Sequence, residues 1–175
     1  VAHARFHGRQ IGLDVAKELA FTGRMVPGTE CVELGLATHL SDDPRADALA
    51  LATEIAYTAG LRAHELLTLQ PRSERTPDPR PALPTKFEGR EDGSRYVVTG
   101  KGGLIREVQL PSHLAARLEA QRLATPRPVT DRHVYYQQHY AIGGGQPWSM
   151  AVSRAAKAAL GWSTGAHGLR HAYAQ

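Results

Sequence analysis

The chain has 175 residues, of which 42% are hydrophobic and 22% are charged, and its formal net charge is +4 at pH 7. This composition is typical of a soluble globular protein, and the lack of a long uncharged apolar run excludes a membrane span. No secretory signal opens the chain, and a single cysteine, Cys31, cannot form an internal disulfide, so we expect a reducing, cytoplasmic setting.

Charge is distributed unevenly along the chain. Residues 1–57 carry 5 Lys and Arg against 8 Asp and Glu, a net −3, whereas residues 58–175 carry 16 against 9, a net +7. A basic block of this kind suggests a polyanionic partner, of which nucleic acid is the commonest. Charge alone leaves equally open that the block binds nothing.

The first third of the chain predicts three helices with clear stops. "LDVAKELAFTG" ends at Gly23, and "PGTECVELGL" offers Thr29 as an N-cap and Gly35 as its end. "SDDPRADALALATEIA" places Asp43 at a cap and Pro44 at the first helical position, where its missing N–H is harmless.

The run "AKELAFTGRMVPGTECVELGLATHLSDDP" resembles the C-terminal part of the crotonase, or enoyl-CoA hydratase and isomerase, family, with Cys31 where a small alanine is usual. The resemblance extends over residues 1–56, about a third of the chain. In crotonases the catalytic groups come mainly from segments upstream of this one, and the sequence begins at Val1. We therefore expect a crotonase-like helical segment and carry over no catalytic residue.

The next elements are a helix, a loop and a hairpin. Gly60 marks a break, and the following helix has an apolar side of four leucines, Leu61, Leu66, Leu67 and Leu69. Residues 71–93 hold five of the eleven prolines and predict a loop. "RYVVTGKGGLIREVQL" has apolar and β-branched residues on both sides of Gly-Lys-Gly-Gly, which predicts a β-hairpin.

Two more helices follow. "PSHLAARLEAQRL" is introduced by Pro111 with Ser112 as a candidate cap, and "SMAVSRAAKAALG" ends at Gly161. Between them, "HVYYQQHYAI" offers tyrosines that could stack on bases, although packing within a strand is the interpretation we favour, and "IGGGQPW" predicts a flexible loop. The predicted fold is mixed α/β, mainly helical, with a small antiparallel sheet.

Three groups of polar residues have ordinary structural explanations when taken singly. Arg62 and Glu65 are spaced as a surface ion pair, and Lys101 stands in a solvated turn. His167 and His171 are four residues apart, as in zinc-binding helices, but no glutamate lies between them and no third ligand is evident. We therefore predict neither a metal ion nor a cofactor.

Taken in order, the same residues resemble the catalytic domain of the tyrosine recombinase, or phage integrase, family. The resemblance rests on three boxes, "TAGLRAHELLTL", "VTGKGGLIREVQLP" and "HGLRHAYAQ", within residues 58–175. It implies a catalytic domain over residues 57–175 that binds double-stranded DNA, with no membrane partner and with assembly as a homo-oligomer on the DNA.

The resemblance also implies roles for the residues of the boxes. Arg62 and Arg170 would grip the non-bridging oxygens of a DNA phosphate, since guanidinium forks stay charged and match phosphate geometry. Lys101 would be the general acid at the leaving sugar oxygen, and His167 an acid, base or phosphate donor. Two supporting residues would orient these groups, Glu65 and His171.

The family's nucleophilic tyrosine lies some tens of residues beyond the third box, whereas the sequence ends at Gln175. Tyr173 is only three residues beyond Arg170 and matches an aromatic packing position. We therefore expect these residues to be a recombinase core that does not cleave DNA by itself. The alternatives are a fragment of a crotonase-family acyl-CoA hydratase or isomerase, and a chimera of both families without function.

Overall fold

The computed structural model describes Glu30, Glu33 and residues 43–79, 85–89 and 92–173. The chain divides into two compact units, Val1–Asp47 and Ala48–Gln175. The first helix predicted before Asp43 lies outside the described residues, as do the second apart from Glu30 and Glu33 and most of the segment predicted to be crotonase-like. The elements described below belong almost entirely to the second unit.

Helix α3, Pro44–Ala59, starts as predicted. The Asp43 Oδ1 atom accepts hydrogen bonds from the backbone N–H groups of Arg45, at 3.1 Å, and Ala46, at 3.0 Å, so the first turn is capped. The helix continues across residues 56 and 57, where the sequence predicts that a resemblance to crotonases ends and a resemblance to tyrosine recombinases begins. Its buried side enters the core of the second unit with five residues, Leu51, Ala52, Ile55, Ala56 and Ala59.

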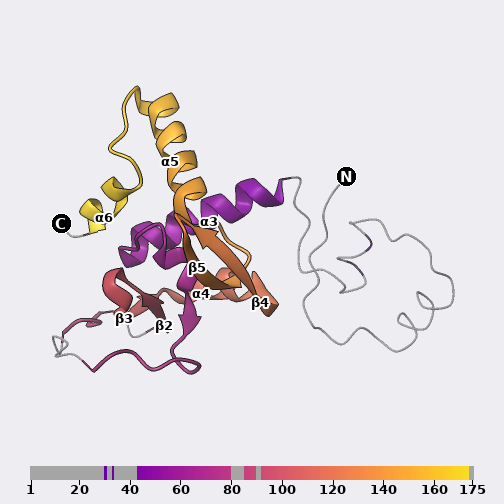
Figure 1. Ribbon diagram of the computed structural model, residues 1–175, viewed down its shortest axis with the longest axis vertical. Coiled ribbons are helices and arrows are strands. Elements are labelled where there is room, and N and C mark those ends of the chain that lie inside the picture. The colour runs from indigo at the N-terminus through magenta and orange to yellow at the C-terminus, as the bar shows by residue number, and fades with distance from the viewer. Residues whose placement is uncertain (1–29, 31–32, 34–42, 80–84, 90–91, 174–175) are drawn as a thin grey trace. The chain divides into compact units, whose positions relative to one another are not determined.

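Helices and antiparallel strands alternate after α3, which confirms the mixed α/β class (Figure 1). In chain order the elements are the 3₁₀ helix η1 (Glu65–Thr68), β1 (Gln70–Pro71), β2 (Ser94–Thr99), the 3₁₀ turn η2 (Lys101–Gly103), β3 (Ile105–Leu110), α4 (Ser112–Glu119), β4 (Arg122–Asp131), β5 (Val134–Tyr140), α5 (Gly145–Leu160) and α6 (His167–Tyr173). None of the described helices is both long and apolar enough to cross a membrane.

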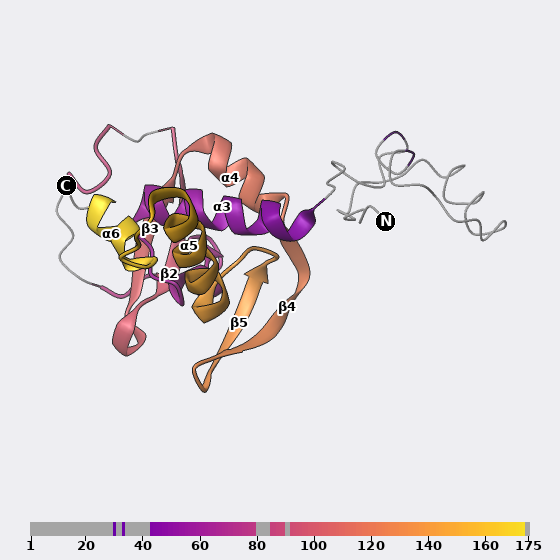
Figure 2. The same ribbon diagram turned by 90° about the horizontal axis from the view of Figure 1, so that it is seen from above.

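The strands form two sheets where one was predicted. The first has the order β1-β2-β3, and its β2–β3 hairpin is the one that Gly-Lys-Gly-Gly predicts, with Thr99 opposite Ile105. The second sheet is the β4–β5 hairpin, in which Asp131 pairs with Val134 across a two-residue turn. Figure 2 shows the turns of both hairpins on the same side of the unit.

The core lies between α3, the β2–β3 hairpin, α4 and the start of α5. Trp148 and Tyr140 are its largest side chains, each 1% exposed. Their polar atoms are paired, as buried polar atoms require: Trp148 Nε1 donates to Thr53 Oγ1 at 3.1 Å, and the Tyr140 hydroxyl donates to Glu119 Oε1 at 2.7 Å. These bonds fasten α5 to α3 and β5 to α4.

Three predicted elements differ from the structure. The helix predicted after Gly60 is a single 3₁₀ turn, because Pro71 forces the residue before it into an extended conformation and that residue pairs with β2. Helix α4 ends at Glu119 instead of continuing to residue 123, since β4 begins pairing at Arg122. The predicted glycine-rich loop is partly helix, because α5 begins at Gly145.

The predicted cap of α4 is also wrong. The Ser112 hydroxyl donates to the backbone carbonyl of Asp92 and makes no capping bond, and Pro111 is the N-cap residue. At the other end of the chain, the predicted stop of α5 is confirmed. Gly161 follows Leu160 with φ at +78°, the left-handed conformation that glycine adopts without a steric penalty.

Candidate functional site

The Glu65 carboxylate is the centre of the candidate site. It lies in the first turn of η1 and is 0% exposed. Its Oε2 atom accepts the backbone N–H of Arg62 at 2.7 Å, and its Oε1 atom accepts a hydrogen bond from Arg62 Nη1 at 3.0 Å. The sequence alone also allowed a surface ion pair between Arg62 and Glu65, and this interpretation is wrong because Glu65 is fully buried.

A second arginine reaches the same carboxylate from β3. Arg106 donates from Nε to Glu65 Oε1 at 3.2 Å and from Nη2 to Glu65 Oε2 at 2.7 Å, and Nη2 also bonds to the Gly60 carbonyl at 3.3 Å. The hairpin is held against η1 by a bond from the Thr99 N–H to Thr68 Oγ1 at 2.9 Å. The paired contact of the Arg106 guanidinium with the Glu65 carboxylate is the strongest geometry for these two groups.

The third arginine comes from α6. Arg170 Nη1 lies 3.8 Å from Glu65 Oε2, and this buried nitrogen has no hydrogen-bond partner in the described part of the chain. Helix α6 is anchored by Leu169, which packs on the core, and by the Tyr173 ring, which lies against Gly60. We call Arg62, Arg106 and Arg170 around Glu65 the arginine cluster.

The charges of the arginine cluster do not balance. Burial favours the neutral form of Glu65, but the hydrogen bond and charge of Arg106, with Arg62, outweigh it and lower the pKa of this carboxyl. Burial lowers the pKa of Arg170, and the neighbouring guanidinium of Arg62 lowers it further. One carboxylate thus faces three cations, whose side chains are 25% to 35% exposed. An anion can approach this surplus positive charge from solvent.

Three predicted site residues lie outside the arginine cluster. Lys101 is exposed in the turn between β2 and β3, and His167 and His171 are exposed on α6, with their rings edge to face at 4.9 Å. In the described residues, no hydrogen bond or ion pair joins any of them to Glu65. Of the six predicted residues, the structure brings together Arg62, Glu65 and Arg170.

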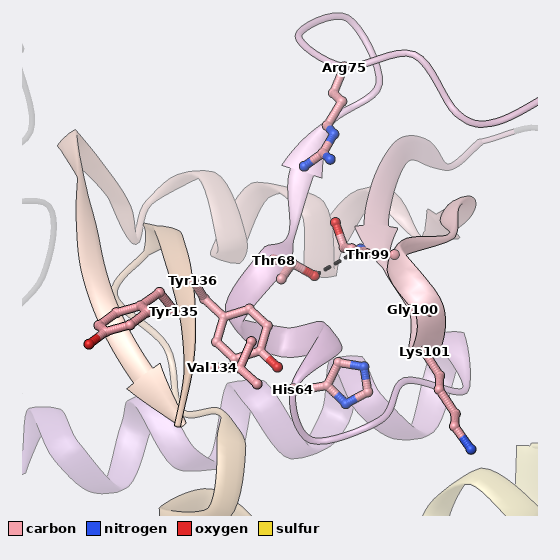
Figure 3. A pocket seen from close by; sticks show the side chains of 11 residues that line it. His64, Thr68, Arg75, Thr99, Gly100, Lys101, Val134, Tyr135 and Tyr136 are labelled. Carbon is pink, nitrogen blue, oxygen red and sulfur yellow. Dashed lines mark hydrogen bonds between the residues drawn. The ribbon is translucent and has the colours of Figure 1, made fainter. Parts of the chain in front are cut away.

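An open pocket of about 490 Å³ lies beside the arginine cluster. The Gly100–Gly103 turn forms one wall, the start of β5 forms another, and η1 lies between them (Figure 3). Seven of its lining side chains are polar or aromatic: His64, Thr68, Arg75, Thr99, Lys101, Tyr135 and Tyr136. Figure 3 shows Tyr136 facing His64 and Arg75 entering from the opposite side, whereas Lys101 extends away from Tyr136.

Sequence reasoning missed Arg106 as a site residue, along with the pocket residues His64, Arg75 and Tyr136. Arg106 had a signal, since it lies within the second box, "VTGKGGLIREVQLP". Of the pocket residues, Tyr136 belongs to the tyrosine-rich run that could stack on bases, whereas His64 and Arg75 had no signal, because the pocket forms only when the β4–β5 hairpin lies beside the β2–β3 turn.

Metal ligands are not grouped in the described residues, where no three His, Cys, Asp or Glu side chains lie together. No protein-family model, curated protein or solved structure matches this chain. The resemblances to tyrosine recombinases and to crotonases therefore stay predictions from the sequence.

Proposed function

We propose that this chain is a DNA-binding part of the catalytic core of a site-specific tyrosine recombinase, acting in the cytoplasm on double-stranded DNA as a homo-oligomer. The observation that supports this function best is the arginine cluster, in which three guanidinium groups from separate elements share one buried carboxylate. Glu65 holds the guanidinium groups in place and leaves them a net positive charge.

A phosphodiester is the anion that fits the arginine cluster best. Arg170 Nη1 is buried without a hydrogen-bond partner in the described residues, which is costly unless an acceptor arrives. Guanidinium forks bind phosphate oxygens through paired N–H groups, and they stay charged at any working pH. The net charge of +7 over residues 58–175 would add longer-range attraction to a DNA backbone.

In the proposed reaction a tyrosine hydroxyl attacks a DNA phosphorus, a phosphotyrosyl bond forms, and the bond to the leaving sugar oxygen breaks. Lys101 would give its proton to that oxygen, and His167 would accept the proton that the tyrosine hydroxyl loses, or would hold the phosphate while that proton passes to water. The arginine cluster would stabilise the charge on the non-bridging oxygens. The Tyr173 ring packs against Gly60, which favours a structural role for it over that of the nucleophile.

The proposal is tested by fluorescence anisotropy with a labelled duplex at several salt concentrations. We expect log Kd to rise steeply with log salt, as counterion release requires. Arg62→Gln and Arg170→Gln are each expected to weaken binding about tenfold and to make the salt dependence shallower. The matched control is Arg117→Gln, which also removes one positive charge but from an exposed ion pair with Glu54 on α3.

Two results would contradict the proposal. The first is binding that does not change between low and moderate salt. The second is an equal loss for Arg117→Gln and for Arg62→Gln, because it would mean that only the total charge matters. A nicked duplex that traps covalent intermediates completes the test, since an adduct formed by these 175 residues would show that they contain the nucleophile.

A further inference from the structure

The pocket beside the arginine cluster combines two kinds of side chain, and of these only Lys101 has a role above. One kind is aromatic: the Tyr136 and His64 rings are nearly parallel, at 25°, with centroids 6.3 Å apart. Burial lowers the pKa of His64, which favours the neutral form of this ring. The other kind is cationic, with Arg75 on one side of the pocket and Lys101 on the rim (Figure 3).

This combination suits a nucleotide. A base has a flat face that stacks on tyrosine or histidine, and its phosphate pairs with arginine or lysine. The centroid separation of Tyr136 and His64 is at the wide end of the range for paired rings, so the two rings pack only loosely on each other. The Thr99 hydroxyl adds a hydrogen-bonding group to the lining, whereas the Thr68 hydroxyl is already bonded to the Glu65 carbonyl and to the Thr99 N–H.

The pocket and the arginine cluster share a wall. Gly100 lines the pocket, and a Cβ atom at this position would lie 3.2 Å from Glu65 Oε1, so the backbone here passes directly beside the central carboxylate. His64, on the pocket side, immediately precedes Glu65. A DNA strand with one phosphate on the arginine cluster would therefore bring a neighbouring nucleotide to the pocket.

A base within a duplex does not fit this arrangement. Both of its faces are covered by neighbouring base pairs, so it reaches a pocket wall only when it leaves the stack. The β4–β5 hairpin supplies that wall through Tyr136. The preceding tyrosine, Tyr135, is 82% exposed and extends away from Tyr136, so Tyr136 is the tyrosine that faces His64 (Figure 3).

We propose that the pocket between the Gly100–Gly103 turn and Val134–Tyr136 binds an unpaired nucleotide of a DNA strand whose neighbouring phosphate lies on the arginine cluster. This inference rests on the proposed function, because it places the same strand across both sites. It adds that the protein prefers DNA with an unpaired nucleotide to fully paired DNA.

The test uses the whole chain and two duplexes of equal length, one fully paired and one with a single unpaired 2-aminopurine. We expect the wild-type protein to bind the second duplex about tenfold more tightly, and the fluorescence of 2-aminopurine to fall as it stacks on tyrosine. Tyr136→Ala is expected to remove both differences, whereas Tyr136→Phe keeps the ring and is expected to keep them. Tyr57→Ala, an exposed tyrosine on α3, serves as the control.

Each outcome separates this inference from the proposed function. Equal affinity for the two duplexes, with binding still dependent on Arg62, would overturn the pocket and leave the proposed function. Binding of single-stranded DNA that depends on Tyr136, without any duplex binding, would overturn the proposed function and keep a nucleotide site. Equal affinity for thymidine monophosphate and for the duplex with one unpaired nucleotide would show that the neighbouring phosphate of the strand adds nothing to binding, and would overturn this inference.

Discussion

Glu65 is the residue on which the arginine cluster depends, because a buried carboxylate is the common partner of three guanidinium groups. Glu65→Gln would keep the shape of the side chain and remove its charge. Removing one partner of a buried ion pair leaves the other charges uncompensated, so we expect a loss of about 3 kcal/mol in the free energy of unfolding. Urea denaturation measures this loss.

The control for this substitution is Glu54→Gln. The ion pair of Glu54 with Arg117 has both side chains 47% exposed, and exposed pairs contribute less than about 1 kcal/mol. Equal losses for the two substitutions would contradict the central role of Glu65.

The lowered pKa of Glu65 also predicts a pH dependence of stability. Folding lowers the pKa of this carboxyl below its ordinary value of 4.5, so the unfolded chain binds more protons in the acid range. The stabilisation by Glu65 is therefore complete above about pH 4.5 and decreases as the pH falls through the folded-state pKa. We expect the stability difference between wild type and Glu65→Gln to shrink from pH 6 to pH 3. A constant difference over this range would mean that the pKa is not shifted.

Gly60 is the other residue with a sharp steric requirement. Its φ is +61°, and an added Cβ atom would lie 2.5 Å from Cδ1 of the Tyr173 ring. We expect Gly60→Ala to lower the free energy of unfolding by about 2 kcal/mol, from the left-handed backbone and from the displaced ring. Adding Tyr173→Ala should recover the steric part and leave the backbone part. No recovery in the double variant would show that the ring does not limit this position.

At the scale of elements, local sequence patterns correctly predicted the helix ends and the turn that neighbouring residues determine. Asp43 and Pro44 predict the start of α3, Gly161 the end of α5, and Gly-Lys-Gly-Gly the β2–β3 hairpin, and all three are confirmed. The start of α5 is determined by a distant residue. The Asp131 carboxylate at the end of β4 accepts the Gln146 N–H at 2.7 Å, which no local sequence pattern indicates.

The candidate site follows the same division. Arg62 and Glu65 are three residues apart, so their spacing in the sequence predicts a contact, although Arg62 precedes η1 and the contact forms across the turn before it. Arg106 is 41 residues from Glu65, and only the pairing of β2 with β3 brings it there. Strand β4 was not predicted, because Pro126 and Pro128 argue against a strand, although a two-stranded sheet tolerates proline on its open edge.

The β4–β5 turn gives a prediction at this scale. Arg132 and His133 have φ of +48° and +65°, values that favour Asn and Gly in a two-residue hairpin turn. We expect Arg132→Asn with His133→Gly to raise the free energy of unfolding by about 1 kcal/mol, since the strained conformation becomes an ordinary one. Thermal unfolding measures the gain. Arg127→Asn, on the same strand but outside the turn, is the control, and an equal effect of both changes would refute the explanation by strain.

At the scale of the whole molecule, the question is where the folded unit begins. The resemblance to tyrosine recombinases begins near residue 57, but the compact unit begins at Ala48, within α3. The buried residues of α3 share one core with β2, β3 and α4, so residues before position 57 supply packing to the rest of the unit. A boundary in family resemblance is therefore a different property from a boundary in packing.

This difference can be measured with two shortened chains. Residues 43–175 keep the cap and all of α3, and we expect one sharp thermal transition close to that of the full chain. Residues 57–175 lose four core side chains, Leu51, Ala52, Ile55 and Ala56. Their burial contributes roughly 5 kcal/mol or more, which is comparable with the stability of a whole domain, so we expect this chain to be unfolded. A sharp transition for residues 57–175 would show that α3 is not part of the core, and a broad transition for the full chain would favour a chimera without function.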